Sequence, residues 1–261
     1  MERGHFRAST TSGNELARVV RVIEVEDFHK AYASHVAVRG VSFCVGPGEI
    51  LGLIGPNGAG KTTTMRAIAG IIPASRGRLT VAGYDVAAEP IAAKSRTAFV
   101  PDEPPLFSDL TVAEHLSFYA SVYEVAGAEE AALQLLTEFE LAERLHTPAG
   151  QLSRGMRQKL AICCAYLHDP QALLFDEPLT GLDPQGIRVL KRSLQQRAAH
   201  GAAVIVSSHL LAMVEDLCTR VLILASGEQR FCGAVEELRS SFEEIEATAR
   251  LEDMFFAATM S

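Results

Sequence analysis

The sequence predicts an α/β fold with a mixed sheet at its core, an antiparallel β subdomain and an inserted helical subdomain. Apolar and polar residues alternate in residues 22–28 and 36–43, as they do in antiparallel strands with one buried face. Residues 50–54 are continuously apolar, which is expected for a strand buried on both faces. Strand-like and helix-like segments then alternate along the chain, a pattern typical of a sheet with right-handed crossovers.

The remaining elements follow in order. A helix is expected from Lys61 to about Ile71, because Pro73 stops it. Residues 111–144 are helical in pattern, with Gly127 between two amphipathic stretches. The further strands are expected at residues 78–81, 98–100, 172–175, 202–207 and 221–224. We therefore expect one domain over residues 22–240 with a helical insertion at about 102–170. A flexible leader (1–21) and a short C-terminal extension (241–261) flank it.

Composition narrows the function classes. The 261 residues carry 24 Lys and Arg against 32 Asp and Glu, a net charge of −8. Phosphate neutralisation supplies most of the affinity of general nucleic-acid binders, so no nucleic-acid partner is expected. The five cysteines are odd in number and form no CxxC pair, which fits a reducing compartment. No apolar stretch reaches the length of about 20 residues that a spanning helix needs.

The strongest local signal is a phosphate-binding loop. Residues 55–62 read Gly-Pro-Asn-Gly-Ala-Gly-Lys-Thr and directly follow the apolar strand at 50–54. They match the pattern G-x-x-x-x-G-K-[ST], in which backbone N–H groups cradle phosphates, the lysine reaches the β- and γ-phosphates and the hydroxyl binds Mg²⁺. This pattern predicts a P-loop NTPase. The expected nucleotide-binding residues here are Gly55, Pro56, Asn57, Gly58, Ala59, Gly60, Lys61, Thr62 and Thr63.

Two carboxylates end a later strand. Residues 173–175 are apolar and are followed by Asp176 and Glu177. An aspartate in this position holds Mg²⁺ in P-loop NTPases, so Asp176 is expected to share the metal with Thr62. Glu177 is placed to act as the general base that polarises the attacking water.

One segment narrows the prediction to a family. Residues 152–158, Leu-Ser-Arg-Gly-Met-Arg-Gln, lie between the phosphate loop and the acidic strand. They resemble the LSGGQ signature of ATP-binding cassette (ABC) proteins, with Arg154 and Met156 at its third and fifth positions. Ser153 can cap the helix that follows, and Gly155 permits close approach of an anion. A P-loop kinase would lack this segment.

Three further features match the same family, over residues 22–232. Tyr32 corresponds to the aromatic residue that stacks on adenine, and residues 180–183, ending in Asp183, are similar to the D-loop. His209 follows the strand at 202–207 and corresponds to the switch histidine that contacts the γ-phosphate. The resemblance thus implies Lys61, Glu177 and His209 as catalytic residues.

One position departs from the family pattern. Where the family usually has a glutamine after the strand that ends near residue 101, this chain has Asp102, followed by Glu103. A carboxylate can also ligate Mg²⁺, so we expect Asp102 at the metal, with Glu103 as the alternative.

The resemblance also implies partners. ABC cassettes pair head to tail, so Ser153, Gly155 and Asp183 are expected at the nucleotide of a second, identical or different, ABC ATPase subunit. ATP and Mg²⁺ are the implied cofactors. The stretch 102–107, Arg154 with Met156 and the tail at 251–255 resemble export-type cassettes. The expected function is an ATPase that powers export through a separate transmembrane permease subunit, docked by the helical insertion and residues 102–108 on the cytoplasmic face of the membrane. The alternative is a soluble ABC ATPase that acts on ribosomes or DNA.

Overall fold

A computed structural model describes residues 21–33, 35–208 and 211–240. The expected leader, except Arg21, and the expected C-terminal extension at 241–261 lie outside these residues. His209, the expected switch histidine, also lies outside them.

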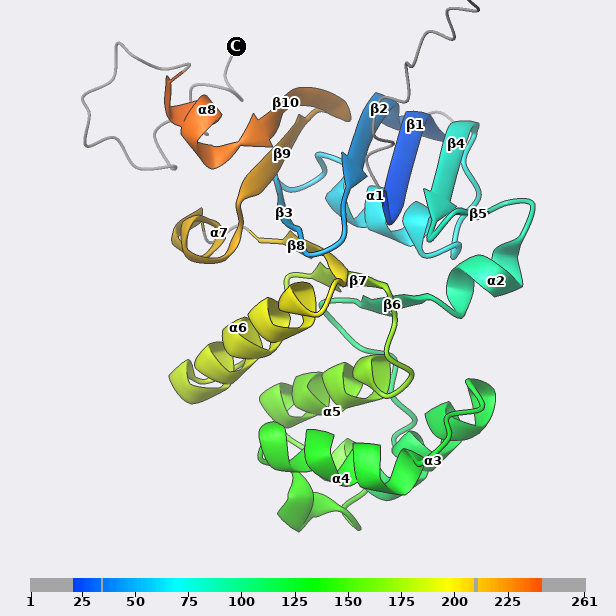
Figure 1. The fold of residues 1–261 in the computed structure, drawn as a ribbon, viewed down its shortest axis with the longest axis vertical. Coiled ribbons are helices and arrows are strands. Elements are labelled where there is room, and N and C mark those ends of the chain that lie inside the picture. The colour runs from blue at the N-terminus through cyan, green and yellow to red at the C-terminus, as the bar shows by residue number, and fades with distance from the viewer. Residues whose placement is uncertain (1–20, 34, 209–210, 241–261) are drawn as a thin grey trace, which may run out of the picture.

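Two sheets form the centre of the described part of the chain (Figure 1). The larger has the strand order β10-β9-β3-β8-β7-β6, and all of its neighbours are parallel except the pair β9 and β10. Its strands are β3 (Ile50–Ile54), β6 (Thr97–Val100), β7 (Ala172–Asp176), β8 (Ala203–Ser207), β9 (Arg220–Ala225) and β10 (Glu228–Ala234). The smaller sheet is antiparallel with the order β2-β1-β4-β5. Its strands are β1 (Ile23–Tyr32), β2 (His35–Val45), β4 (Arg76–Val81) and β5 (Tyr84–Asp85).

The helices fall into groups around the sheets. In Figure 1, α3, α4 and α5 lie together at one end of the molecule, although the strands before and after them in the chain, β6 and β7, pair directly. The helices are α1 (Lys61–Ile68), α2 (Pro90–Lys94), α3 (Val112–Val122), α4 (Ala128–Glu138), α5 (Arg154–Tyr166), α6 (Pro184–Ala199), α7 (Leu211–Leu217) and α8 (Val235–Ser240). Two 3₁₀ helices, Ala142–Arg144 and Ala149–Gln151, connect α4 to α5.

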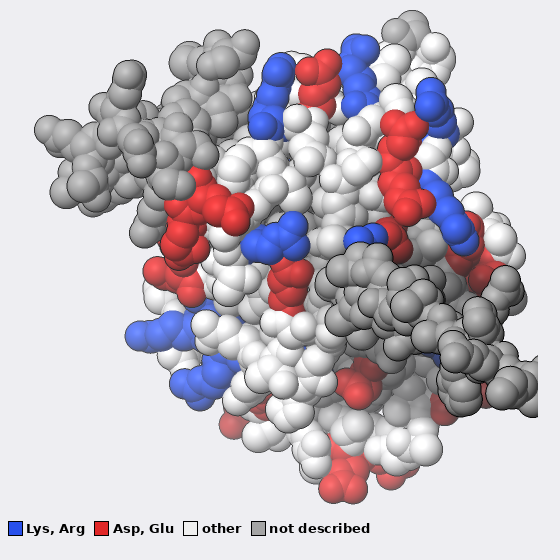
Figure 2. Space-filling view, turned by 45° about the horizontal axis from the view of Figure 1, so that its top comes forward, with Lys and Arg blue, Asp and Glu red and all other residues white. Residues whose placement is uncertain are grey.

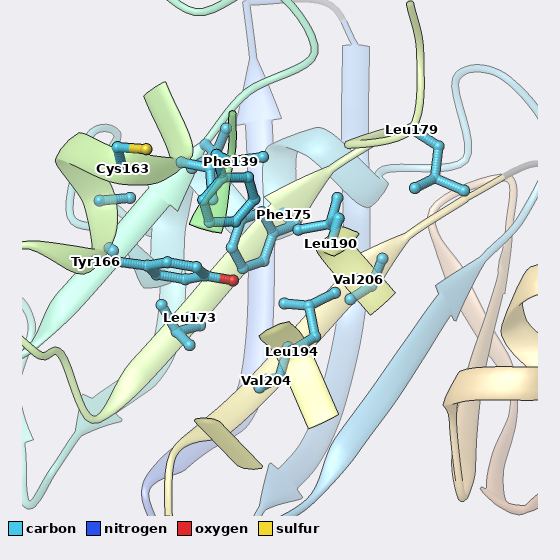
Figure 3. Packing of buried hydrophobic residues seen from close by; sticks show 14 of the residues in the cluster. Phe139, Cys163, Tyr166, Leu173, Phe175, Leu179, Leu190, Leu194, Val204 and Val206 are labelled. Atoms are coloured by element: carbon cyan, nitrogen blue, oxygen red, sulfur yellow. The ribbon is translucent and has the colours of Figure 1, made fainter. Parts of the chain in front are cut away.

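Alternation along β7 explains the two layers of the core. Leu173 and Phe175 face the cluster formed with α3 to α6, whereas Ala172 and Leu174 face the cluster shared with α1 and the antiparallel sheet. Figure 3 shows Phe175 beside Phe139 and Tyr166 in the first cluster. Because every residue of β7 is buried, the carboxyl end of the strand is fixed on both sides.

The predicted fold class is confirmed, and the elements differ in detail. Helix α1 ends at Ile68 rather than near Ile71, because Gly70 takes a left-handed conformation (φ +65°). Strand β10 and helix α2 were not predicted: β10 begins with three exposed residues and continues with mostly half-buried ones, so it lacks a clear alternation. Figure 2 shows Lys and Arg interspersed with Asp and Glu on one face of the molecule, without a surface of one sign.

Candidate nucleotide-binding site

The phosphate loop connects β3 to the start of α1. Gly60 has φ +102°, and a Cβ on it would lie 2.8 Å from the carbonyl oxygen of Ala37. A side chain there would therefore clash with β2 as well as strain the backbone. The absence of a Cβ lets the loop close tightly over the N-terminus of α1, where backbone N–H groups face an incoming anion.

Lys61 is the first residue of α1 and is only 7% exposed. Its Nζ donates to the carbonyl oxygen of Gly55 at 2.7 Å and to that of Pro56 at 3.2 Å. Burial lowers the pKa of the ammonium, while the carboxylates of Glu177 and Asp176 act in the opposite direction. The loop thus holds a desolvated cation at the mouth of its own cradle, where it can pair with phosphate oxygens.

Asp176 joins the two halves of the site. Its Oδ2 accepts from the Thr62 hydroxyl at 2.6 Å, and its Oδ1 accepts from the Ser207 hydroxyl at 2.6 Å. Ser207 Oγ in turn accepts from the backbone N–H of Glu177 at 3.0 Å. One serine therefore positions both acidic residues, and sequence reasoning missed it. The available signal was its place at the end of an apolar strand, in register with Asp176.

Glu177 follows directly in a strained conformation. Its φ is +50°, which is uncommon for a residue with a Cβ. Strained backbone of this kind persists where the surroundings hold it, and it turns the chain sharply after β7. The turn places Glu177 on the wall of the same cavity as Lys61 and Thr62.

These residues enclose one cavity of about 470 Å³. Most of the predicted nucleotide and metal residues lie on its wall, together with two that were not predicted, His35 and Ala37. The lining residues are Tyr32, His35, Ala37, Asn57, Gly58, Ala59, Gly60, Lys61, Thr62, Thr63, Asp102, Asp176 and Glu177. Gly55 and Pro56 instead contribute the carbonyl groups that hold Lys61.

The hairpin between β1 and β2 supplies one end of the cavity. Tyr32 is 45% exposed there, and the Nζ of Lys30 lies 4.9 Å from the centre of its ring. His35 is the register partner of Tyr32 across the hairpin, and the pairing of the two strands brings it to the same wall. An exposed ring beside a phosphate cradle is suited to stacking on a nucleobase.

Three predicted residues lie away from this cavity. Ser153 caps α5, with its Oγ accepting from the N–H of Met156 at 3.2 Å. Asp183 caps α6, with its Oδ1 accepting from the N–H of Gly186 at 2.8 Å. Gly155 packs against the backbone of Gly181, because a Cβ there would lie 2.5 Å from the Gly181 carbonyl oxygen. Ser153 and Asp183 are exposed, so both remain accessible to a second molecule.

The structure separates the two candidate carboxylates after β6. Asp102 lines the phosphate cavity, and its Oδ1 accepts from Nη2 of Arg154 at 3.1 Å. Glu103 lines a neighbouring groove instead. Of the two, Asp102 is therefore the one placed to act at the phosphates.

The residues present fit a metal–triphosphate complex. The hydroxyl of Thr62 and the carboxylate of Asp176 are in direct contact, and both are hard oxygen ligands of the kind that Mg²⁺ prefers. The glycine loop offers backbone N–H groups, Lys61 offers an ammonium and Tyr32 offers an aromatic face, in one continuous cavity. Mg²⁺ usually binds through one or two protein oxygens plus substrate phosphates, which matches this small donor set.

Comparisons with known proteins agree with the geometry. The family model described as ABC transporter matches residues 38–180. The chain is 36% identical over 240 residues to the ABC-type transporter ATP-binding protein EcsA of Bacillus subtilis (strain 168), covering 91% of this chain and 96% of that protein. It is 34% identical over 228 residues to the Nod factor export ATP-binding protein I of Sinorhizobium fredii, covering 87% of this chain and 66% of that protein.

A solved structure of an ATP-binding subunit of an ABC transporter superposes with a TM-score of 0.86 at 35% identity, over 91% of this chain and 99% of that one. The family model covers more than half of the chain, and these relatives extend the match to most of it. The chain therefore belongs to the ABC transporter family and is one of its ATP-binding, ATP-hydrolysing cassettes.

Proposed function

We propose that this chain hydrolyses Mg–ATP to power export through a separate transmembrane subunit, at the cytoplasmic face of a membrane. The observation that supports this most directly is the contact of Asp176 with Thr62, beside Glu177, in one cavity. A phosphate cradle, a pair of metal-type ligands and a general base are the parts that phosphoryl transfer to water requires.

Each residue has a distinct part in the proposed reaction. The backbone of the glycine loop and Lys61 bind and orient the β- and γ-phosphates. Mg²⁺ held by Thr62 and Asp176 would neutralise charge that develops on the phosphate oxygens. Glu177 accepts a proton from the attacking water, and Ser207 fixes its backbone for this task. His209, which lies outside the described residues, is assigned contact with the γ-phosphate from the resemblance to ABC proteins.

A second cassette completes the site. Ser153, Gly155 and Asp183 do not line the cavity of their own chain, and the N-terminus of α5 carries the partial positive charge of a helix end. A head-to-tail partner would bring that helix end to the γ-phosphate from the opposite side. ATP would then hold the two chains together, and hydrolysis would release them.

The groove next to the cavity is the proposed docking place for the transmembrane subunit. Its volume is about 570 Å³, and it lies between β6, the segment after it, and helices α3 and α5. Apolar side chains such as Phe99, Leu106 and Tyr119 line it, with Arg66 and Lys94 among the lining residues. Among the described residues, no helix is both long and apolar enough to cross a bilayer. The apolar lining of the groove supports a separate membrane partner.

The export direction rests on similarity. The Sinorhizobium relative is named for Nod factor export, and the export-type features of residues 102–107 and of Arg154 lie beside the docking groove and the nucleotide cavity. We therefore place this chain with export-type cassettes.

The Glu177→Gln variant tests the hydrolytic part of the proposal. It keeps the size of the side chain but removes the base, so Mg–ATP binding should remain while phosphate release falls by about 100-fold or more. In sedimentation velocity, the variant should form an ATP-dependent dimer. Lys61→Ala, which removes the phosphate contact, is the matched control and should bind no nucleotide. An unchanged rate of phosphate release in Glu177→Gln would remove Glu177 from the reaction.

The partner is tested separately. Affinity purification of the full chain from membranes, followed by identification of the bound integral protein, should recover a polytopic permease. Recovery of ribosomes alone at moderate salt would instead support the soluble alternative.

A further inference from the structure

Arg154 lies where three segments of the chain meet. It is the first residue of α5, and its guanidinium donates to the Asp102 carboxylate, which follows β6. The Cγ and Cδ of Arg154 lie 3.0 Å from the position that a Cβ on Gly181 would occupy. The aliphatic part of Arg154 therefore packs against the turn that follows Glu177, and its charged end reaches the wall of the nucleotide cavity.

The start of α5 has little freedom to shift. The close approach of Gly155 to the carbonyl oxygen of Gly181 fixes the first turn of the helix, and Ser153 caps it. Because the backbone and the side-chain stem of Arg154 are held in this way, the guanidinium is the part that can move. Its side chain is 49% exposed, so water is available to it when the pair is broken.

The wall of the nucleotide cavity carries more carboxylates than cationic side chains. Three carboxylates line the cavity, those of Asp102, Asp176 and Glu177, together with one ammonium, that of Lys61. A triphosphate adds further negative charge beside them. A divalent cation bound with the phosphates can compensate Asp102, and so can Arg154, but the same oxygen cannot serve both at full strength.

We propose that Arg154 is a positioning residue of the nucleotide site: its guanidinium and a Mg²⁺–nucleotide complex are alternative partners of the Asp102 carboxylate. This inference rests on the proposed function, because it takes the cavity as the site of Mg–ATP. When the Mg²⁺–nucleotide complex binds, the Asp102 carboxylate interacts with it and its ion pair with the guanidinium of Arg154 is broken. The Asp102 and Arg154 side chains are 45% and 49% exposed, so their ion pair shifts an equilibrium by about fivefold at most and is readily displaced.

The exchange of partners at Asp102 would also affect the docking groove. Pro101 and Glu103, the two neighbours of Asp102, line the docking groove rather than the nucleotide cavity. When Asp102 changes partner, the segment that forms one wall of the groove loses its ion pair to α5, which forms another wall.

A double-mutant cycle with Arg154→Gln and Asp102→Asn tests the proposal. The measurement is the affinity of a non-hydrolysable ATP analogue by calorimetry, at a protein concentration where sedimentation shows a monomer. With Mg²⁺, Arg154→Gln should bind about two- to fivefold more tightly than the parent chain, because the competitor is lost. In the Asp102→Asn background the same substitution should have no effect. With EDTA in place of Mg²⁺, Arg154→Gln should give no tightening.

The matched control is Arg78→Gln. Arg78 forms an ion pair with Asp85 at 2.8 Å on the antiparallel sheet, and neither residue lines the nucleotide cavity. The Arg78→Gln variant loses the same charge by the same substitution, and its affinity for the ATP analogue should equal that of the parent chain. Weaker or equal binding of Arg154→Gln with Mg²⁺, or equal tightening in both Asp102 backgrounds, would overturn the proposal. If the parent chain and Lys61→Ala bind the Mg²⁺ complex equally poorly, the proposed function itself fails.

Discussion

Replacing Ser207 by alanine should destabilise the chain through its two acidic residues. The Ser207 hydroxyl is fully buried, donates to Asp176 and accepts from the backbone N–H of Glu177. Alanine removes both hydrogen bonds and leaves a buried carboxylate oxygen and a backbone donor without these partners. Asp176 keeps the bond from Thr62, so the metal-type pair remains in place.

The magnitude follows from the two bonds. A hydrogen bond to a charged group contributes about 1.5–3 kcal/mol and a neutral one about 0.5–1.5 kcal/mol. Asp176 is 4% exposed, so little bulk water reaches the vacated position. The free energy of unfolding should fall by about 2–4 kcal/mol, and ATP hydrolysis should slow because the Glu177 backbone loses an anchor.

Urea unfolding of Ser207→Ala and of Thr97→Val would measure this. Thr97 is also a buried hydroxyl residue, but it makes a single neutral bond, to the Ala93 carbonyl at 2.8 Å, far from the acidic pair in the chain. Its isosteric replacement should cost about 1 kcal/mol. If Ser207→Ala is no more destabilising than Thr97→Val, Ser207 does not organise the acidic pair and the reasoning is wrong.

Two further outcomes are expected. Burial lowers the pKa of His168, and the opposing effects of the Thr97 backbone and of the Asp169 charge are smaller. The folded chain therefore binds the His168 proton less readily than the unfolded chain does. Stability is then lost as the pH falls below the ordinary value of 6.5, and His168→Phe should lose less stability than the parent between pH 7.5 and pH 5 in thermal unfolding. Equal loss in both chains would contradict this cause. Asp102→Gln keeps an oxygen ligand toward the cavity, so equilibrium dialysis should find its Mg–ATP affinity within about tenfold of the parent; complete loss would show that the charge is required.

The sequence predicted best those elements whose local pattern of apolar residues and glycines indicates a single type of structure. The run at 50–54 became β3 with all of its residues buried, and Gly127 separates α3 from α4 as expected, in a left-handed conformation (φ +66°). Strand β10 has no such pattern. It exists because it pairs with β9, a contact that periodicity within one segment does not contain.

The site likewise contains residues that a local pattern predicts and residues that only strand pairing brings in. The phosphate loop and Asp176 could be predicted from the sequence, because each directly follows or ends an apolar strand. Ser207 and His35 enter the site only through strand pairing: Ser207 is in register with Asp176, and His35 with Tyr32. The ion pair of Asp102 with Arg154 joins residues that are far apart in the sequence. Such contacts depend on where the helical insertion returns to the sheet.

The strand order explains why Asp102 and Arg154 meet. Along the sheet order β3-β8-β7-β6, the carboxyl ends supply the phosphate loop, Ser207, the acidic pair and Asp102 in turn. Helices α3 to α5 are inserted between β6 and β7, which are neighbours, so the insertion leaves the sheet beside the site and returns beside it. A charge placed where it leaves, such as Asp102, is therefore close to the start of its last helix, α5. The carboxylate of Asp102 and the guanidinium of Arg154, each of which alone would leave an uncompensated charge beside the site, pair with each other across that gap.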